Sequence, residues 1–221
     1  MFLYMKAEDL MLNQNFPLHC GGLVSYTEQH GGMFIVKQRF ETKDIILGKA
    51  KQEDLHSIYN NYWNSETSAR YMFWVPQKNL AEAQDRLNRT INFQKSNYAY
   101  FIYEKKTGEA IGQAAMVELD DGVWQDGGIG MGEKFVGKGY GKQILNCFID
   151  YLFTEKNAKK ILCSCHPDNN PSRQLQLSCG LKFSHLEEVK REKDNEPYLY
   201  EFYSIDRSEW NKLRDKSKRE N

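Results

Sequence analysis

The chain has 221 residues, of which 40% are hydrophobic and 13% aromatic, enough to build one buried core. Lysine and arginine total 30, as do aspartate and glutamate, so the formal net charge is zero and no partnership with nucleic acid or an anionic membrane is expected. Apolar runs stay shorter than the roughly 18 residues of a membrane helix, and Lys6, Glu8 and Asp9 interrupt the apolar core that a signal peptide needs.

The five cysteines are an odd number in a chain too long for a small disulfide-stapled secreted domain, so a reducing cytoplasm is the expected compartment. Cys163 and Cys165 are separated by one residue, and on a strand they would face one side as small hydrophobic groups. His166 and Cys179 lie close by in the sequence. Zinc sites usually combine two ligand pairs, and the chain has no CxxC pair, so no metal is expected.

The predicted elements mix strands and helices. A strand over residues 44–50 precedes a helix over 51–63, and a second helix starts at Asn79 with Glu82 as its capping-box partner. The remaining predicted elements are strands at 98–104 and 109–119 joined by a tight turn, a glycine-rich strand at 127–133, a helix at 142–156, a strand at 160–165, a short helix at 171–178, and strands at 182–190 and 198–205.

This order predicts a mixed α/β (α+β) fold, with hairpins at both ends and one strand–loop–helix–strand crossover between them, and it excludes a doubly wound sheet. We expect one domain over residues 41–206. Residues 1–40 form an N-terminal extension without an assigned role, within which Met33 is a candidate translation start. Residues 207–221 form a polar C-terminal tail.

The strongest chemical signal is the segment GKGYGK at residues 137–142, between a predicted strand and a predicted helix. Glycines at alternate positions allow a sharp bend in which backbone N–H groups converge. The following helix adds its own unpaired N–H groups and the positive end of its dipole. The segment therefore predicts a phosphate or pyrophosphate site, to which Lys138 and Lys142 add positive charge.

The spacing excludes two common phosphate motifs. A P-loop needs a glycine at the position of Val136 and Ser or Thr at the position of Gln143. The dinucleotide fingerprint that starts at Gly137 needs a third glycine where the chain has Lys142.

The same loop and its surroundings resemble the GCN5-related N-acetyltransferases (GNAT). GIGMGEKFVGKGYGKQIL resembles that family's fourth strand and pyrophosphate loop, whose signature is Gln/Arg-x-x-Gly-x-Gly/Ala, and HPDNNPSRQLQLSCGLKF resembles the end of its fifth strand and the next helix. ETKDIILGKAKQEDL and YMFWVPQKNLAEAQDRL are similar to the RimJ/RimL branch, which acetylates the N-termini of ribosomal proteins. The resemblance covers about residues 41–206.

The resemblance implies a central, mostly antiparallel sheet flanked by helices, with acetyl-CoA in a cleft where the fourth and fifth strands splay apart. The loop amides would hold the pyrophosphate, the strand before the loop would pair with the pantetheine arm, and Asn169 would hydrogen-bond that arm. Ser172 would serve both as a cofactor contact and as the catalytic group near the departing thiolate. The full set of implied cofactor residues is Gly130, Met131, Gly132, Val136, Gly137, Lys138, Gly139, Tyr140, Gly141, Lys142, Asn169 and Ser172.

Two positions depart from the family pattern. Val136 stands where the signature has Gln or Arg, a change that leaves the backbone N–H groups in place. Gln176 stands where many members have a tyrosine that acts as general acid, so Ser172 or a water molecule has to supply the contact to the thiolate.

The reaction needs a neutral amine, and a lysine side chain depends more on a general base than an α-amine does. A strand amide at Met131 or its neighbour would polarise the thioester carbonyl. We expect Glu118 to be the catalytic base, and Asp126, Glu187 and Glu188 are alternatives.

The acceptor is expected to be a primary amine, either at a protein N-terminus or on a small molecule. Tyr71, Phe73 and Trp74 would line its site or belong to the core. A catalytically silent acyl-CoA-binding module is the alternative function. Homodimers are common in the family, so the resemblance allows a homodimer, and the sequence itself does not determine the oligomeric state.

Overall fold

The computed structural model describes residues 36–190 and 197–219. Most of the predicted extension, including Met33, therefore lies outside the described residues. Within the described part, eight strands form one sheet in the order β1-β2-β3-β4-β5-β6-β8-β7. Neighbouring strands are antiparallel except for β5 and β6, which run parallel. The strands are β1 (Arg39–Glu41), β2 (Ile45–Gly48), β3 (Ala99–Glu104), β4 (Ala110–Asp120), β5 (Val123–Met131), β6 (Lys160–Cys165), β7 (Lys182–Lys190) and β8 (Pro197–Asp206).

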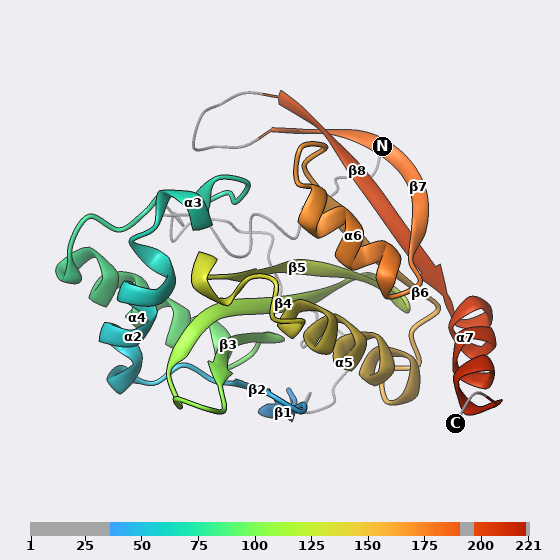
Figure 1. Cartoon of the computed structure of the whole chain (residues 1–221), viewed down its shortest axis with the longest axis horizontal. Coiled ribbons are helices and arrows are strands. Elements are labelled where there is room, and N and C mark those ends of the chain that lie inside the picture. Colours follow the sequence, from blue (N-terminus) through green and yellow to red (C-terminus); the bar gives the residue numbers. More distant parts are fainter. Residues whose placement is uncertain (1–35, 191–196, 220–221) are drawn as a thin grey trace.

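Helices cover both faces of this sheet (Figure 1). Alternate residues of β3 show the division, because Tyr100 and Ile102 join one buried cluster with Phe148 of α5, whereas Phe101 joins another with Leu87 of α4. The first face carries α5 (Tyr140–Thr154), α6 (Asn170–Ser178) and α7 (Arg207–Arg219); the second carries α2 (Leu55–Ile58), the π-helical turn η2 (Tyr59–Trp63), α3 (Glu66–Ala69) and α4 (Leu80–Gln94). Short 3₁₀ turns are η1 (Gln52–Asp54) and η3 (Glu133–Phe135).

The sheet and most predicted elements confirm the mixed α/β fold expected from the sequence. The turn between β3 and β4 closes through a hydrogen bond from Gly108 N–H to Glu104 O of 2.8 Å. At the start of α4, Asn79 Oδ1 accepts from Glu82 N–H at 3.0 Å, as predicted. The Glu82 carboxylate accepts from Lys78 N–H at 2.9 Å and from the Asn79 side-chain amide at 3.4 Å, rather than from the Asn79 backbone N–H of a capping box.

Three boundaries differ from the prediction. The single helix predicted over 51–63 consists of η1, α2 and η2 in succession. Strand β5 begins at Val123, four residues before the predicted strand. Strand β1 crosses the boundary set at residue 40, and Phe40 is buried in the core, so the folded body begins before residue 41.

The predicted polar tail forms α7, which the polar composition alone did not indicate. Trp210 is buried against Phe153 of α5 with ring centroids 5.1 Å apart, and its Nε1–H donates to Asp150 Oδ1 at 2.9 Å. One large apolar residue thus fixes an otherwise charged helix to the sheet's helical layer. No helix in the described ranges is long and apolar enough to cross a membrane.

The two parallel strands part soon after they begin to pair. Residues Val123–Gln125 of β5 pair with Lys160–Leu162 of β6, whereas the rest of β6 pairs only with β8. The pairing of β5 with β4 shifts between Ile129 and Asp126, which leaves Gly127 and Gly128 as a bulge, and Gly128 has a φ of +94°. Because bulges bend and twist a strand, these glycines direct β5 away from β6 and open a fork in the sheet.

Candidate active site

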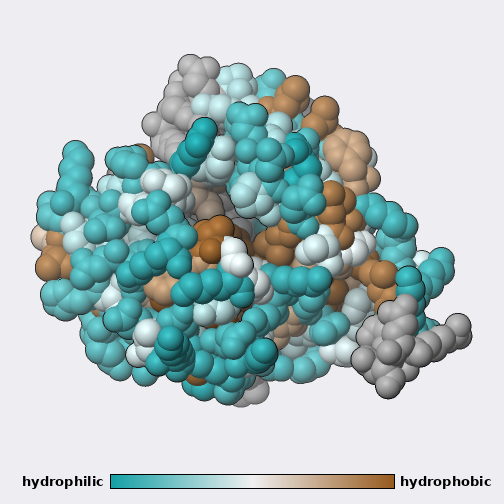
Figure 2. Space-filling view, in the orientation of Figure 1, coloured by the Kyte–Doolittle hydropathy of each residue, from teal (hydrophilic) through white to brown (hydrophobic). Residues whose placement is uncertain are grey.

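A cavity of about 640 Å³ opens from the fork between β5 and β6. The space-filling view shows this face of the molecule hollowed near its centre, with hydrophobic residues at the hollow (Figure 2). Its walls come from β5, the loop before α5, the end of β6, α6, and the segment between α3 and α4. The site thus combines segments that are far apart in the sequence, from Tyr62 to Tyr200.

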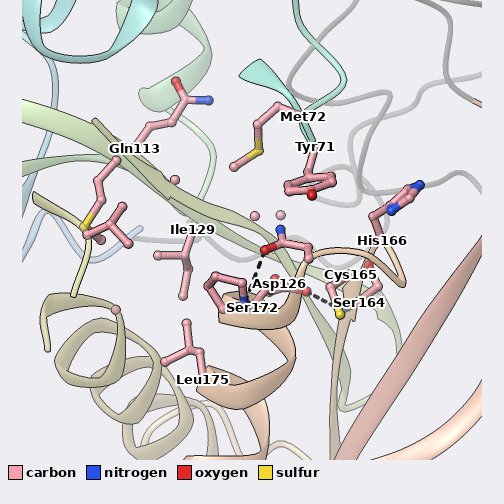
Figure 3. A pocket seen from close by; sticks show the side chains of 18 of the residues that line it. Tyr71, Met72, Gln113, Asp126, Ile129, Ser164, Cys165, His166, Ser172 and Leu175 are labelled. Atoms are coloured by element: carbon pink, nitrogen blue, oxygen red, sulfur yellow. Dashed lines mark hydrogen bonds between the residues drawn. The ribbon is translucent and has the colours of Figure 1, made fainter. Parts of the chain in front are cut away.

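Asp126 lies where the two strands separate, and its side chain lines the cavity (Figure 3). Its Oδ1 accepts from the backbone N–H of Ser164 on β6 at 3.2 Å. If the pairing of β5 with β6 continued past Leu162, this N–H would bond to the backbone of β5 instead. Burial raises the pKa of Asp126 to about 7, an effect that the bonds from Ser164 and Cys163 only partly offset. A carboxyl group with this pKa can accept a proton near neutral pH.

The glycine-rich loop has the conformation that its sequence predicts. Gly137 and Gly139 have φ values of +83° and +80°, in the left-handed region that favours glycine, and open space surrounds the position of a Cβ at each. Gly139 is the N-cap of the fifteen-residue helix α5. The first N–H groups of α5 therefore have no helical acceptor, and with the helix dipole they favour an anion at the cavity wall.

Lys138, which was predicted to contribute to the loop, is not among the residues that line the cavity. Its Nζ pairs with Glu104 Oε1 at 3.2 Å, and the Tyr140 hydroxyl donates to the same oxygen at 2.7 Å. These two bonds, that of Tyr140 first, hold the pKa of Glu104 below its usual range although burial opposes them. Lys138 thus ties the loop to β3, and Lys142 is the loop lysine that lines the cavity.

The strand before the loop supplies two of its three predicted residues. Gly130 and Met131 line the cavity, but Gly132 does not, and its N–H donates to Ile111 O at 3.0 Å. A Cβ on Gly132 would lie 1.8 Å from Asn61 O, so close backbone packing requires a glycine here. Val136, Gly137, Gly139, Tyr140 and Gly141 line the cavity with them.

Asn169 and Ser172 come together at the start of α6. Asn169 Oδ1 accepts from Ser172 N–H at 3.3 Å, which leaves the Asn169 amide N–H groups as donors, and both side chains line the cavity. Gln176, at the position of the family's tyrosine, is buried and donates to Ser172 Oγ and to Ser164 O, both at 3.2 Å. Since Gln176 donates to Ser172 Oγ, the serine keeps its own hydrogen for another acceptor.

An ion pair fixes α6 against β8. Arg173 donates to both carboxylate oxygens of Glu201, at 2.7 and 2.8 Å, and this pair lowers the pKa of Glu201. A two-bond contact of this kind restricts orientation as well as distance. It therefore holds Ser172, one residue earlier, in a defined place.

The structure does not bring Glu118 to the cavity, so the expectation that it is the base is not supported. Glu118 is exposed near the end of β4, and its Oε1 accepts from Gly122 N–H at 3.2 Å in the turn to β5. Glu187 and Glu188 lie on β7, and neither lines the cavity. Of the four predicted carboxylates, Asp126 alone is a cavity residue.

Aromatic residues form the end of the cavity opposite the glycine loop. The predicted Tyr71, Phe73 and Trp74 line it together with Tyr200, which the sequence did not indicate, and with His166, which the sequence indicated only as a neighbour of the cysteines. Figure 3 labels Tyr71 and His166 at this end. His166 directly follows β6, and residues at the carboxyl end of a strand beside a fork are a known signal for a ligand site.

Cys163 and Cys165 are buried on one side of β6, as predicted, and burial raises the pKa of both thiols. Across residues 36–190 and 197–219, no group of three His, Cys, Asp or Glu side chains is arranged to hold a metal ion.

A family model described as the acetyltransferase (GNAT) domain matches residues 44–182, more than half of the chain. A relative from Bacillus licheniformis named uncharacterized N-acetyltransferase p20 is 27% identical over 145 residues, which cover 64% of this chain and 80% of the relative.

Solved structures share the fold at low sequence identity. A putative ribosomal-protein-serine acetyltransferase from Vibrio cholerae has a TM-score of 0.65 at 22% identity, covering 76% of this chain and 97% of its own. A spermidine N-acetyltransferase from Vibrio cholerae, solved with CoA and spermine, has a TM-score of 0.61 at 19% identity, covering 76% and 99%. The chain therefore belongs to the GNAT acetyltransferase family and is an N-acetyltransferase.

Proposed function

We propose that the fork between β5 and β6 binds acetyl-CoA, and that the protein transfers the acetyl group to a primary amine that enters from the aromatic end of the cavity. The observation that carries this proposal is the position of Asp126 and Ser172 between the start of α5, which favours an anion, and the aromatic residues (Figure 3). Family membership implies acetyl transfer from acetyl-CoA, and the roles of the residues below are our assignment.

The loop and strand fit the two chemically distinct parts of coenzyme A. The diphosphate needs concentrated donors, and the loop that ends at Gly139 presents backbone N–H groups at a helix start. The pantetheine arm carries amides, and β5 beyond Gln125 has a backbone edge that β6 does not pair with. The Asn169 amide N–H groups add donors beside that edge.

The chemistry requires a proton acceptor for the amine and a donor for the sulfur. Asp126 takes a proton from the incoming ammonium group, for which a pKa near 7 is well suited. The backbone N–H of Met131 or its neighbour stabilises charge on the carbonyl oxygen of the thioester. Ser172, whose oxygen already accepts from Gln176, donates a hydrogen bond to the departing thiolate, and the proton that the nitrogen loses as the amide forms ends on the CoA sulfur. Acetyl-CoA supplies the activated acyl group.

Either kind of acceptor fits this chemistry. One similar structure is a putative ribosomal-protein-serine acetyltransferase, which favours a protein α-amine as in the RimJ/RimL branch; another is a spermidine N-acetyltransferase, which favours a small amine.

The test combines binding with turnover. We expect acetyl-CoA to bind in a calorimetric titration and to raise the unfolding temperature, and we expect free thiol to appear only when an amine acceptor is added. Acetyl-CoA binding without thiol release from any peptide or amine would instead identify a silent acyl-CoA-binding module.

We also propose that the protein forms a homodimer, as the family resemblance suggests. Strand β7 is an edge of the described sheet, and Phe183 and Leu186 on it are 56% and 53% exposed. Sedimentation at micromolar concentration measures the assembly, and a monomer at that concentration contradicts this part of the proposal.

A further inference from the structure

The aromatic end of the cavity has a composition that selects among amines. We infer that the acceptor is a small primary monoamine that carries a planar aromatic ring. This inference rests on the function proposed above and specifies the acceptor for the same site.

Aromatic rings form the walls of this end. The Tyr71 and His166 rings stack with centroids 5.4 Å apart, and the Phe73 and Tyr200 rings are 5.8 Å apart. His166 also meets Tyr200 edge to face at 5.8 Å. Tyr71 and Phe73 are half-buried and line the cavity, so parts of their surfaces remain available to a ligand. A planar ring gains both buried area and favourable ring contacts in such surroundings.

Hydrogen bonds hold these walls together across three parts of the chain. The Tyr71 hydroxyl donates to Asp168 O, after β6, at 3.2 Å, and the Tyr200 hydroxyl of β8 donates to Tyr71 O at 3.5 Å. The segment between α3 and α4 is thereby fixed over the fork. The aromatic surface is therefore part of the folded site and does not require a ligand to assemble it.

Charge limits the acceptor to one ammonium group. Asp126 is the single acidic side chain among the described cavity residues, and it lies at the fork where the reacting amine has to be. Behind the aromatic wall, the buried guanidinium of Arg86 lies 4.5 Å from the rings of both Trp63 and Trp74. Its Nη1 has no hydrogen-bond partner among the described residues. A second or third ammonium group, as in a polyamine, would have no second carboxylate among the described cavity residues, and the positive charge of Arg86 behind Trp74 would disfavour it further.

Size favours a small molecule over a polypeptide. The cavity of about 640 Å³ has to accommodate the pantetheine arm and acetyl group of the coenzyme as well as the acceptor. Cavities of this size hold drug-sized molecules. The space left beside the coenzyme therefore favours a small acceptor, such as one ring with a short aminoalkyl arm.

The experiment compares amines that differ in one property at a time. With purified protein and acetyl-CoA, kcat/KM is measured by thiol release for 2-phenylethylamine, n-hexylamine, spermidine and a short peptide with N-terminal serine. We expect 2-phenylethylamine to exceed each of the others by about tenfold or more, the scale of one to two aromatic contacts.

Two substitutions of Phe73 test whether the aromatic residues of the cavity cause this preference. Phe73→Ala should reduce the ratio of 2-phenylethylamine to n-hexylamine toward one, and Phe73→Glu should raise the use of spermidine by adding a carboxylate. Val75→Ala is the matched control, because Val75 is on the same segment, is 43% exposed and does not line the cavity. It should leave the ratio unchanged, and circular dichroism verifies that each variant is folded.

The outcomes distinguish the inferred acceptor from the proposed acetyl transfer. Preference for spermidine, n-hexylamine or the peptide overturns the inference about the acceptor and leaves the proposed acetyl transfer intact. Binding of acetyl-CoA without turnover of any amine overturns the proposed transfer, and the inference with it. An unchanged amine ratio in folded Phe73→Ala also overturns the inference.

Discussion

At the scale of single residues, Asp126 determines how the activity depends on pH. Its pKa near 7 means that the fraction of the carboxylate form falls about tenfold per pH unit below that value. We expect kcat/KM to rise up to about pH 7 and then level off. Asp126→Asn should lower kcat by about 10²–10⁴-fold, leave acetyl-CoA affinity unchanged and remove the pH step. Glu118→Gln serves as the carboxylate control and should retain full activity; the reverse result would restore Glu118 as the base.

The same carboxyl group affects stability with a definite sign. Its pKa is raised from 3.8 to about 7 in the folded protein, so the folded state binds more protons than the unfolded state between these values. Stability contributed by the protonated carboxyl is therefore lost as pH rises through this window. Urea unfolding at pH 4 and pH 8 should show Asp126→Asn gaining stability relative to the native protein at the higher pH, and an equal difference at both pH values would contradict the burial of this group.

Ser172 is expected to act on the leaving group and not on binding. Ser172→Ala should lower kcat by about 10–100-fold, the range for a lost hydrogen bond to a charged group, with little change in the affinity for acetyl-CoA. Ser178→Ala is a control on the same helix, since its hydroxyl donates to Leu175 O and is exposed. If kcat in rapid-mixing and steady-state assays is unaffected by Ser172→Ala, another hydrogen-bond donor stabilises the departing thiolate.

Some site residues could be identified from the sequence, whereas the position of the catalytic carboxylate depends on the tertiary structure. Asn169 and Ser172 were named because their segment resembles the corresponding helix of the GNAT family, and both line the cavity. Asp126 was named as one of four carboxylates, but the sequence favoured Glu118, three residues from the turn. The difference depends on the bulge at Gly127, which turns Asp126 toward β6, and strand pairing of this kind is not encoded in local spacing.

At the scale of elements, the loop before α5 depends on the left-handed conformation of its glycines. Gly139→Ala keeps open space around the Cβ but forces alanine to a φ of +80°, which costs about 1–2 kcal/mol. The loop should relax away from this conformation, so acetyl-CoA affinity should fall about 5–30-fold. Calorimetric titration measures the change.

Gly108→Ala is the control for backbone strain. Gly108 has a similar φ of +74° in the β3–β4 turn, also with open space around the Cβ position, and it does not line the cavity. This variant should lose similar stability without losing affinity. A parallel loss of affinity in both variants would indicate a general effect of strain rather than the loop itself.

Amphipathic helices and hairpins were predictable because their periodicities are local, as α4, α5 and the β3–β4 hairpin show. The π-helical turn at Tyr59–Trp63 was not predictable, because it depends on contacts with residues distant in the sequence. Asn61 Nδ2 donates to Ala110 O at 3.1 Å, and Asn61 O packs against Gly132. The fork likewise follows from the pairing of strands distant in sequence.

At the scale of the whole molecule, α7 illustrates how one residue can connect a polar segment to the core. Trp210→Ala removes the stacking on Phe153 and the bond to Asp150, and it should lower the free energy of unfolding by about 3–5 kcal/mol. Chemical denaturation measures this loss. Because Trp210 does not line the cavity, the folded fraction should keep the native KM for acetyl-CoA. A large change in KM with unchanged stability would place α7 in a different role.

The fork divides the sheet into two groups of strands with few backbone hydrogen bonds between them. Strands β1–β5 form one ribbon and β6–β8 another, and only three residue pairs join their backbones, at Val123–Gln125. A ligand that lies between the unpaired parts of β5 and β6 would replace the missing strand hydrogen bonds and connect the two ribbons. Amide hydrogens of β5 and β6 near Asp126 should therefore exchange more slowly in the liganded protein than in the free one, and saturation at a hundred times the dissociation constant should add about 2.7 kcal/mol to the unfolding free energy. The bound coenzyme would thus take the place of an additional strand between the two ribbons. Both the unfolding free energy and the rate of acetyl transfer would then increase with the concentration of the coenzyme.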